Sequence, residues 1–311
     1  MKKLFFVMLG ILCLLAVGCA GDDAAEEEEA SEEETPAETE KVSVTGTEYS
    51  FDLPATVPGG FVSVEFKNEG KLVHEAAFVK VDQDVPQEQF VADLKAASGE
   101  EGGPIAAYLK PYIAGFFTKA GATETFSQSL PSGNYYVVCA LTDLDSVEGE
   151  QEEEPTGPPL PQHFELGMLK KVTVDGPATV EPPEADTVVA ATEYTFDISG
   201  LQAGKNEILF RNEGPKEIHM AAVLEFPEGV DEAAAGKAIE AFTAESEGPP
   251  PEGTPEPADV GFSGVFEVGG AALFNVDAKA GRVYAFVCFI QDRAGGPPHA
   301  AKGMSKLVKV A

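Results

Sequence analysis

The stretch that decides the fold occurs twice: residues 163–174 read HFELGMLKKVTV, and residues 299–310 read HAAKGMSKLVKV. Each copy places a histidine five residues before a methionine and a glycine directly before that methionine. Each copy then ends in a Val-x-Val step, and alternation of apolar and polar residues is typical of a half-buried β-strand. The two copies predict a repeated unit that ends in a strand.

Further matches extend this repeat through most of the chain. They share offsets of 144 or 145 residues and pair 47–52 with 192–197, 66–70 with 210–214, and 74–77 with 219–222. Self-similarity of this kind indicates duplication of a structural unit. We therefore expect module 1 at residues 41–175 and module 2 at residues 186–311, joined by a linker at 176–185 that is rich in proline and acidic residues.

Each module has the pattern of an all-β fold. Short runs of β-branched and aromatic residues alternate apolar with polar, and turn-forming residues such as Pro58-Gly59-Gly60 separate the runs. This pattern predicts two tandem β-sandwich domains. One helix-like insert interrupts each module, at residues 86–97 and at residues 231–245.

Composition excludes some classes of function. The 311 residues include 21 basic and 53 acidic side chains, for a net charge of −32 at pH 7. Such a surface repels phosphate backbones, so nucleic acid is excluded as a partner. Hydrophobic residues make up 43% of the chain, enough to form folded cores. The sequence contains no phosphate-binding loop, no Ser-His-Asp order and no paired CxxC motifs.

The N-terminus has the features of an export signal. Residues 4–17 form an apolar run, which is shorter than the ~20 residues of a membrane span but suits a secretory signal. The run leads into Cys19 and resembles a bacterial lipobox, which implies a lipid on Cys19 and an extracytoplasmic location at the cell membrane or outer envelope. We therefore expect a signal peptide at 1–18 and an acidic tether at 19–40; cleavage near Gly18 as an ordinary signal peptide is the alternative.

The scarce metal-binding side chains recur in the same order in both modules. They are His74, Cys139, His163 and Met168 in module 1, and His219, Cys288, His299 and Met304 in module 2. Two imidazoles, one thiolate and a weak thioether form the trigonal site that holds mononuclear copper for electron transfer. The sequence therefore predicts one copper site per module.

With these residues, both modules resemble the cupredoxin family of blue copper proteins. The resemblance implies a Greek-key β-sandwich for each module and up to two type 1 copper ions per chain, cycling between Cu(I) and Cu(II). It also implies the ligand roles. His74 and His219 correspond to the early-strand histidines, Cys139 and Cys288 to the thiolates, His163 and His299 to the loop histidines, and Met168 and Met304 to the axial ligands.

Two features depart from the family pattern. The family places few residues between the cysteine and the loop histidine, whereas here 10 separate Cys288 from His299 and 23 lie in the corresponding loop of module 1. Many cupredoxins also have asparagine directly after the early histidine, where this chain has Glu75 and Met220. Longer loops still close, because doubling a loop costs only about 0.6 kcal/mol. These departures favour a copper site in module 2 over one in module 1.

The expected function is electron transfer with a redox protein partner. Copper enzymes of related architecture use additional histidines, commonly in His-x-His pairs, and the sequence has none, so we expect no enzymatic activity and no small-molecule substrate. The alternatives are copper storage or delivery, and a metal-free binding lipoprotein on the same scaffold. The two thiols could instead form a Cys139–Cys288 disulfide or be buried and inert. Asp143 and Asp292, four residues after each cysteine, are expected to form turns.

Overall fold

The computed structural model describes residues 39–98, 104–115, 117–143, 160–243 and 251–311. The predicted signal peptide, Cys19 and nearly all of the acidic tether lie outside these residues. None of the helices within the described ranges is long and apolar enough to span a membrane.

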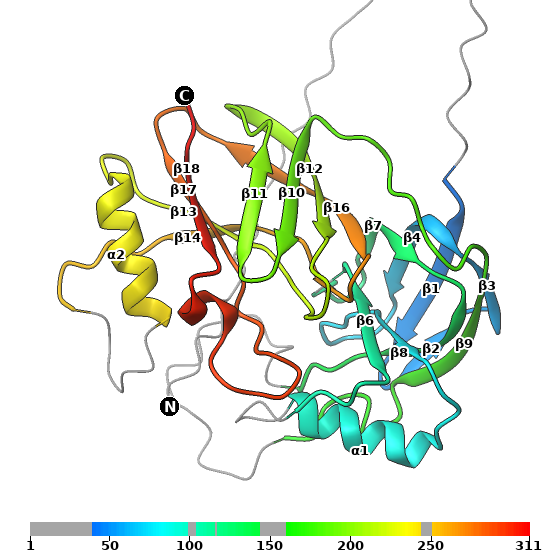
Figure 1. Cartoon of the computed structure of the whole chain (residues 1–311). Helices are drawn as coiled ribbons and strands as arrows, with labels where there is room; N and C mark the ends of the chain where they lie inside the picture. The colour runs from blue at the N-terminus through cyan, green and yellow to red at the C-terminus, as the bar shows by residue number, and fades with distance from the viewer. Residues whose placement is uncertain (1–38, 99–103, 116, 144–159, 244–250) are drawn as a thin grey trace, which may run out of the picture.

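The described residues confirm an all-β fold with one short helical insert in each module (Figure 1). The elements of module 1 are β1 (Lys41–Thr47), β2 (Ser50–Asp52), β3 (Thr56–Pro58), β4 (Gly60–Asn68), β5 (Ala77–Val81), α1 (Gln87–Ser98), β6 (Leu109–Ile113), β7 (Thr123–Leu130), β8 (Gly133–Val138) and β9 (Leu169–Asp175). The elements of module 2 are β10 (Thr187–Thr192), β11 (Thr195–Ser199), β12 (Gly204–Asn212), β13 (Ala222–Glu225), α2 (Glu232–Thr243), β14 (Ala258–Phe262), β15 (Val265–Phe266), β16 (Ala271–Ala278), β17 (Val283–Val287), the 3-10 helix η1 (His299–Lys302) and β18 (Ser305–Lys309).

Strand pairing repeats between the modules. In module 1, β1 pairs antiparallel with β2 and parallel with β4, and β8 lies between β5 and β9. In module 2, β10 pairs in the same way with β11 and β12, and β17 lies between β13 and β18. The sequence repeat is therefore also a structural repeat.

The modules also share sheets, which the sequence does not predict. An eight-stranded sheet has the order β11-β10-β12-β16-β7-β4-β1-β2, so β16 of module 2 joins β7 of module 1. The strand β15 of module 2 likewise extends the sheet of module 1 by pairing with β6. Figure 1 shows this continuous arrangement, with β16 and β7 side by side at the centre.

The core forms where apolar side chains alternate along the strands. Val62, Val64 and Phe66 of β4 are completely buried, and the residues between them are partly exposed. The largest apolar cluster draws on both modules, and the rings of Tyr112 and Phe266 meet across the boundary with centroids 6.4 Å apart. Burying a side chain of this size stabilises the fold by about 1.5–3 kcal/mol. The shared core therefore ties the modules together.

The helices cover the outer faces of the smaller sheets. Phe90 of α1 is buried and stacks on Tyr136 of β8 with ring centroids 4.1 Å apart. In α2, Ala235, Ala238 and Ile239 are buried against β17 and β18. Figure 1 shows α1 and α2 at different sides of the molecule, away from the shared sheet.

Candidate metal centres

The strand ends position the predicted ligands in the same way in both modules. Each cysteine comes directly after a strand, Cys139 after β8 and Cys288 after β17. Each methionine comes directly before the antiparallel partner of that strand, β9 or β18. The loop that connects the two strands carries the loop histidine. The hairpin therefore brings three of the four predicted ligands of a module to one end of the sheet.

The early histidines reach this end from another segment. His74 and His219 lie shortly before β5 and β13, and each forms an isolated antiparallel bridge, with Thr118 and Phe266 respectively. Because β5 neighbours β8, and β13 neighbours β17, the early histidine is placed beside the cysteine. The pairing of these strands thus completes the set of predicted nitrogen and sulfur ligands.

In module 1, the three side chains converge on one point, which we name centre 1 (His74, Cys139 and His163). The two Nδ1 atoms are 3.1 Å apart, and Sγ of Cys139 is 3.8 Å from Nδ1 of His74 and 3.3 Å from Nδ1 of His163. The point equidistant from the three atoms is about 2 Å from each, which is the length of metal–nitrogen and metal–sulfur bonds. All three side chains are completely buried.

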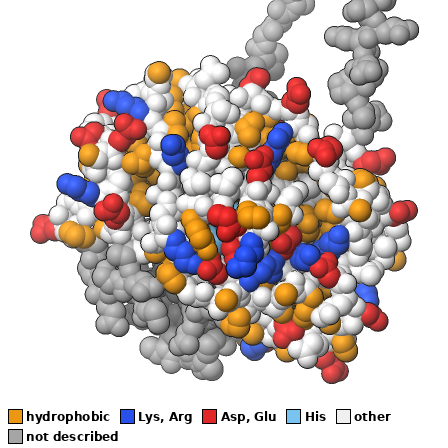
Figure 2. Space-filling model, in the orientation of Figure 1, with side chains coloured by type: hydrophobic (Ala, Val, Ile, Leu, Met, Phe, Trp, Pro, Cys, Tyr) orange, Lys and Arg blue, Asp and Glu red, His pale blue; other side chains and the backbone are white. Residues whose placement is uncertain are grey.

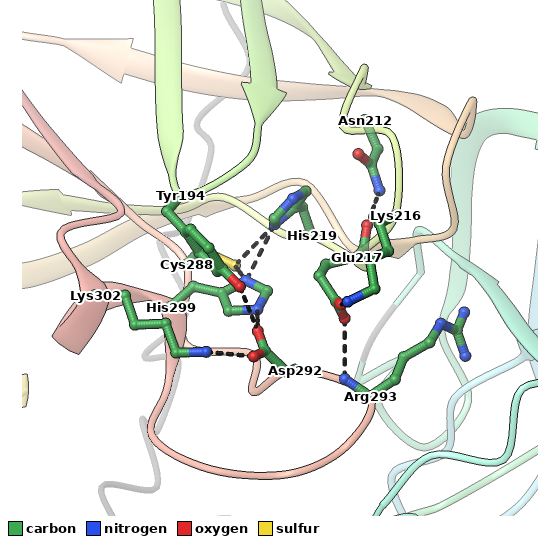
Figure 3. A network of polar contacts seen from close by, with 10 residues as sticks. All are labelled: Tyr194, Asn212, Lys216, Glu217, His219, Cys288, Asp292, Arg293, His299 and Lys302. Atoms are coloured by element: carbon green, nitrogen blue, oxygen red, sulfur yellow. Dashed lines mark hydrogen bonds and ion pairs between the residues drawn. The ribbon is translucent and has the colours of Figure 1, made fainter.

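Module 2 reproduces this geometry in centre 2 (His219, Cys288 and His299; Figure 3). The two Nδ1 atoms are again 3.1 Å apart, and Sγ of Cys288 is 3.9 Å and 3.5 Å from them. These side chains are also completely buried. Neither cysteine forms a disulfide, so the predicted alternative of a disulfide between them is wrong.

The methionines belong to the same buried loops. Met168 and Met304 are completely buried. The amide of Met304 donates to the carbonyl of His299 at 2.9 Å, its carbonyl accepts from the amide of Cys288 at 3.2 Å, and Met168 makes the same two bonds at the same distances. The backbone thus holds each methionine next to its cysteine and loop histidine. Ligation by the thioether sulfurs stays a prediction.

The protonation chemistry of the donors suits a soft metal cation. Burial, with a contribution from the neighbouring histidine, lowers the pKa of His74 and of His219 to about 4, so both are neutral at pH 7. Neutral imidazole is the form that binds metals. Burial raises the pKa of the Cys288 thiol to about 11, so a bound metal has to displace its proton. Two neutral imidazoles and a displaceable thiol proton fit copper.

An aspartate–tyrosine pair holds each loop histidine from its outer side. In module 2, Nε2 of His299 lies 3.0 Å from Oδ1 of Asp292, which also accepts a hydrogen bond of 2.9 Å from the hydroxyl of Tyr194. The Tyr194 ring meets the imidazole edge-on with centroids 5.1 Å apart. Because a carboxylate only accepts, the proton sits on Nε2 and Nδ1 is left to face Cys288.

Module 1 has the same arrangement around His163. Its Nε2 is 3.1 Å from Asp143, and the Tyr49 hydroxyl donates to that aspartate at 2.9 Å. Tyr49 and its equivalent in module 2 have φ values of 59° and 56°, a left-handed conformation that non-glycine residues rarely adopt. The aspartates were expected only to form turns. Each aspartate lies four residues after its cysteine, and this repeated spacing could have indicated that it also contacts the loop histidine.

A buried asparagine braces the segment before each early histidine. The side chain of Asn212 donates to the carbonyls of Glu217 and Phe266, at 2.9 Å each, and accepts from the amide of Gly214 at 3.0 Å. Asn68 makes the equivalent three bonds in module 1. An asparagine therefore supports the site although the position after the early histidine is not asparagine. The Phe-x-Asn-Glu-Gly motif, repeated at residues 66–70 and 210–214, could have indicated this bracing role.

The 10-residue loop between Cys288 and His299 is fixed by Arg293, whose role was not predicted from the sequence. Its guanidinium pairs with Glu267 and donates to the carbonyl of Leu109 at 3.0 Å, and its own carbonyl accepts from Ile105 at 2.8 Å. The loop of module 2 is thus anchored to module 1. Most of the corresponding loop of module 1, residues 144–159, lies outside the described residues.

Comparison with known proteins finds similar chains among solved structures. No protein-family model and no curated protein matches the chain. Among solved structures, auracyanin A, a "blue" copper protein from Chloroflexus aurantiacus, is 21% identical and covers 43% of this chain and 98% of its own, with a TM-score of 0.26. A multicopper oxidase is 12% identical over 87% of this chain and 88% of its own, with a TM-score of 0.21. The copper nitrite reductase of Nitrosomonas europaea is 14% identical over 88% and 94%, with a TM-score of 0.21.

These neighbours correct one expectation and agree with others. The expectation that the chain is not an enzyme is contradicted. The solved structures that align with both modules include a multicopper oxidase and a copper nitrite reductase, which are enzymes. At 12–14% identity the likeness concerns the fold alone, so the activities of these enzymes are not assigned to this chain. The neighbours are copper proteins, and both sets of predicted ligands lie together. The chain has an all-β fold with two candidate copper centres, and it is similar to solved copper proteins.

Proposed function

We propose that the protein binds one copper ion in each module and transfers single electrons through these ions. The observation that carries this proposal is the duplicated convergence of two Nδ1 atoms and one Sγ within 3.1–3.9 Å, in fully buried positions. Copper held there would supply one-electron chemistry between Cu(II) and Cu(I).

The rigidity of the ligand cage supports electron transfer. The loop histidine is held at Nε2 by an aspartate, and the segment before the early histidine is held by a buried asparagine. Ligands that cannot move keep a geometry intermediate between the preferences of the two oxidation states. Such a cage lowers the rearrangement that accompanies each electron. Full burial of the ligands also favours a retained cofactor over a storage or delivery site, whose metal has to exchange.

The partner that we propose is an extracytoplasmic redox protein with basic groups on its docking surface. The net charge is −32, and 11 acidic residues lie in residues 22–40 and five more in residues 148–154. Acidic and basic side chains are interspersed on the face in Figure 2. Nearly all residues of the two acidic runs lie outside the described residues. A lipid on Cys19 would keep the protein at the membrane; this tether remains part of the proposal.

The proposal is tested by adding Cu(II) to the reduced mature chain from residue 20 onward and recording the visible spectrum. We expect an intense band from thiolate-to-copper charge transfer. Substitution of both cysteines, Cys139→Ser with Cys288→Ser, should abolish the band because each centre then lacks its thiolate. An intact, folded chain that shows no such band would contradict the proposal and favour the metal-free scaffold.

A further inference from the structure

The two centres share their ligands but differ in the charges beside the loop histidine. The position three residues after this histidine is Leu166 in module 1 and Lys302 in module 2. Both positions lie in the equivalent loops of the two modules, directly before the glycine and methionine that end each loop. A charge at this position therefore has the same location relative to each centre.

In module 2, Lys302 neutralises the aspartate that holds the loop histidine. Its Nζ donates to Oδ2 of Asp292, while Oδ1 of the same carboxylate faces Nε2 of His299 (Figure 3). Nζ also lies 4.9 Å from the centre of the Tyr194 ring. The side chains of Lys302 and Asp292 are only 25% and 24% exposed, so water screens this pair incompletely. Centre 2 thus faces a carboxylate and an ammonium together.

In module 1, Leu166 brings no charge to the equivalent aspartate. The Leu166 side chain is 42% exposed, and the Asp143 side chain is 52% exposed. Asp143 accepts from Tyr49 and faces His163, as its counterpart does in module 2. At the position of Lys302, centre 1 therefore has an uncharged side chain, so Leu166 supplies no ammonium to its carboxylate.

The position directly after the early histidine also differs between the modules. Glu75 follows His74 and is buried, and its carboxyl oxygen accepts from the amide of Ala140 at 2.8 Å, one residue after Cys139. The equivalent position in module 2 is the uncharged Met220. Module 1 thus has an additional acidic group beside its thiol.

Module 2 also contains a buried acidic residue near its early histidine, but cations and N–H groups surround it. Glu217 is 3% exposed, pairs with Lys216 at 3.1 Å and accepts from the amide of Arg293 at 3.0 Å. The Arg293 guanidinium in turn pairs with Glu267. The carboxylates of Glu217, Glu267 and Asp292 around centre 2 each lie within ion-pair distance of a basic side chain.

We propose that the two centres are poised at different reduction potentials, that centre 2 has the higher potential, and that Lys302 is the main residue responsible. Reduction of copper adds one negative charge to a centre. A nearby cation stabilises the reduced form, and a carboxylate without a cation stabilises the oxidised form. An electron that enters the protein therefore resides preferentially in module 2. This inference rests on the proposed copper-binding function.

The test measures each centre separately in the full mature chain. Cys139→Ser leaves only centre 2 with a thiolate, and Cys288→Ser leaves only centre 1. The potential of each copper is obtained by following the thiolate–copper band during a redox titration. We expect the Cu(I)/Cu(II) equilibrium of centre 2 to lie about tenfold further toward Cu(I), which is about 59 mV for a one-electron couple.

Reciprocal substitutions identify the residue responsible. Lys302→Leu should lower the potential of centre 2 toward that of centre 1, and Leu166→Lys should raise the potential of centre 1. Lys302→Arg should preserve the potential, which separates the effect of charge from that of packing, and Lys302→Gln serves if the leucine variant does not fold. Lys309→Leu, at the far end of β18, is the matched control and should change neither centre.

The possible failures are distinguishable. If neither single-centre chain shows the band, the proposed function is overturned and this inference with it. If both chains bind copper but their potentials differ by less than a twofold change in the equilibrium, the inference alone is overturned. The same holds if centre 2 has the lower potential, or if Lys302→Leu and Lys302→Gln leave its potential unchanged.

Discussion

At the scale of single residues, the loop histidines show how contacts outside the ligand set decide which atom can bind a metal. Nε2 of His299 faces Asp292 at 3.0 Å, and Nδ1 faces Cys288 at 3.5 Å. Without the aspartate, the ring could present either nitrogen or rotate. The carboxylate fixes the tautomer and the orientation before any metal binds.

Replacing that aspartate tests this role. We expect Asp292→Ala to reduce the copper affinity of centre 2 by about 10- to 100-fold, the usual cost of removing an outer hydrogen-bond partner of a metal ligand. Competition with a chelator in the Cys139→Ser chain measures the change. Asp277→Ala, on an exposed position of β16, is the control. Equal affinities in the two variants would show that Asp292 only forms a turn.

The buried asparagines make a second prediction at this scale. Asn212→Ala removes the partner of two carbonyls and one amide, so we expect the free energy of unfolding to fall by about 2–3 kcal/mol. Urea denaturation of the copper-free protein measures it. Asn275→Ala, at an exposed position, should change stability by less than about 0.5 kcal/mol. A comparable loss in both variants would contradict the bracing role.

The sequence predicted the individual ligands better than their supports. The repeated order of histidine, cysteine, histidine and methionine pointed to these side chains, and in each module the two histidines and the cysteine lie together. The sequence could not show that Asp292 meets both Tyr194 and His299, because Tyr194 lies 98 residues away in the chain. Such contacts depend on which strands become neighbours.

At the scale of elements, the strands and helices were predicted from periodicity, whereas their pairing between modules was not. The expected inserts at 86–97 and 231–245 correspond to α1 and α2. The joint between β7 and β16 and that between β6 and β15 follow no local pattern, because any strand edge offers the same backbone groups. Which edges meet is determined by packing of the two cores.

The loop that carries Arg293 gives the prediction at this scale. The Arg293 side chain is 17% exposed and pairs with that of Glu267, which is 10% exposed, so Arg293→Ala leaves a mostly buried acidic group without its cation. We expect a loss of about 3 kcal/mol in the free energy of unfolding, measured in urea. Arg211→Ala removes an exposed pair with Glu213 and should cost less than about 1 kcal/mol. Similar losses in the two variants would contradict an anchoring role for the loop.

At the scale of the whole molecule, the buried histidines couple the stability of the copper-free protein to pH. His74 and His219 have a pKa of about 4 in the folded chain and about 6.5 when unfolded, so the unfolded chain binds more protons between these values. Stability is therefore expected to fall as the pH drops from 6.5 to 4, by roughly 3 kcal/mol per histidine.

Denaturation in urea at pH 7 and pH 5 measures this dependence. The double variant His74→Asn with His219→Asn, which lacks both groups, should lose much less stability over the same interval than the parent chain. A parent chain that is as stable at pH 5 as at pH 7 would show that the histidines are not held in the neutral form.

The central claim is that two independent centres, each made of two histidines and a cysteine, hold copper. The most direct measurement is the number of tightly bound copper ions per chain in four proteins: the parent, Cys139→Ser, Cys288→Ser and the double variant. The structure predicts two, one, one and none, each with a matching thiolate–copper band. Two ions retained in the double variant, or none bound by a folded parent chain, would contradict the claim.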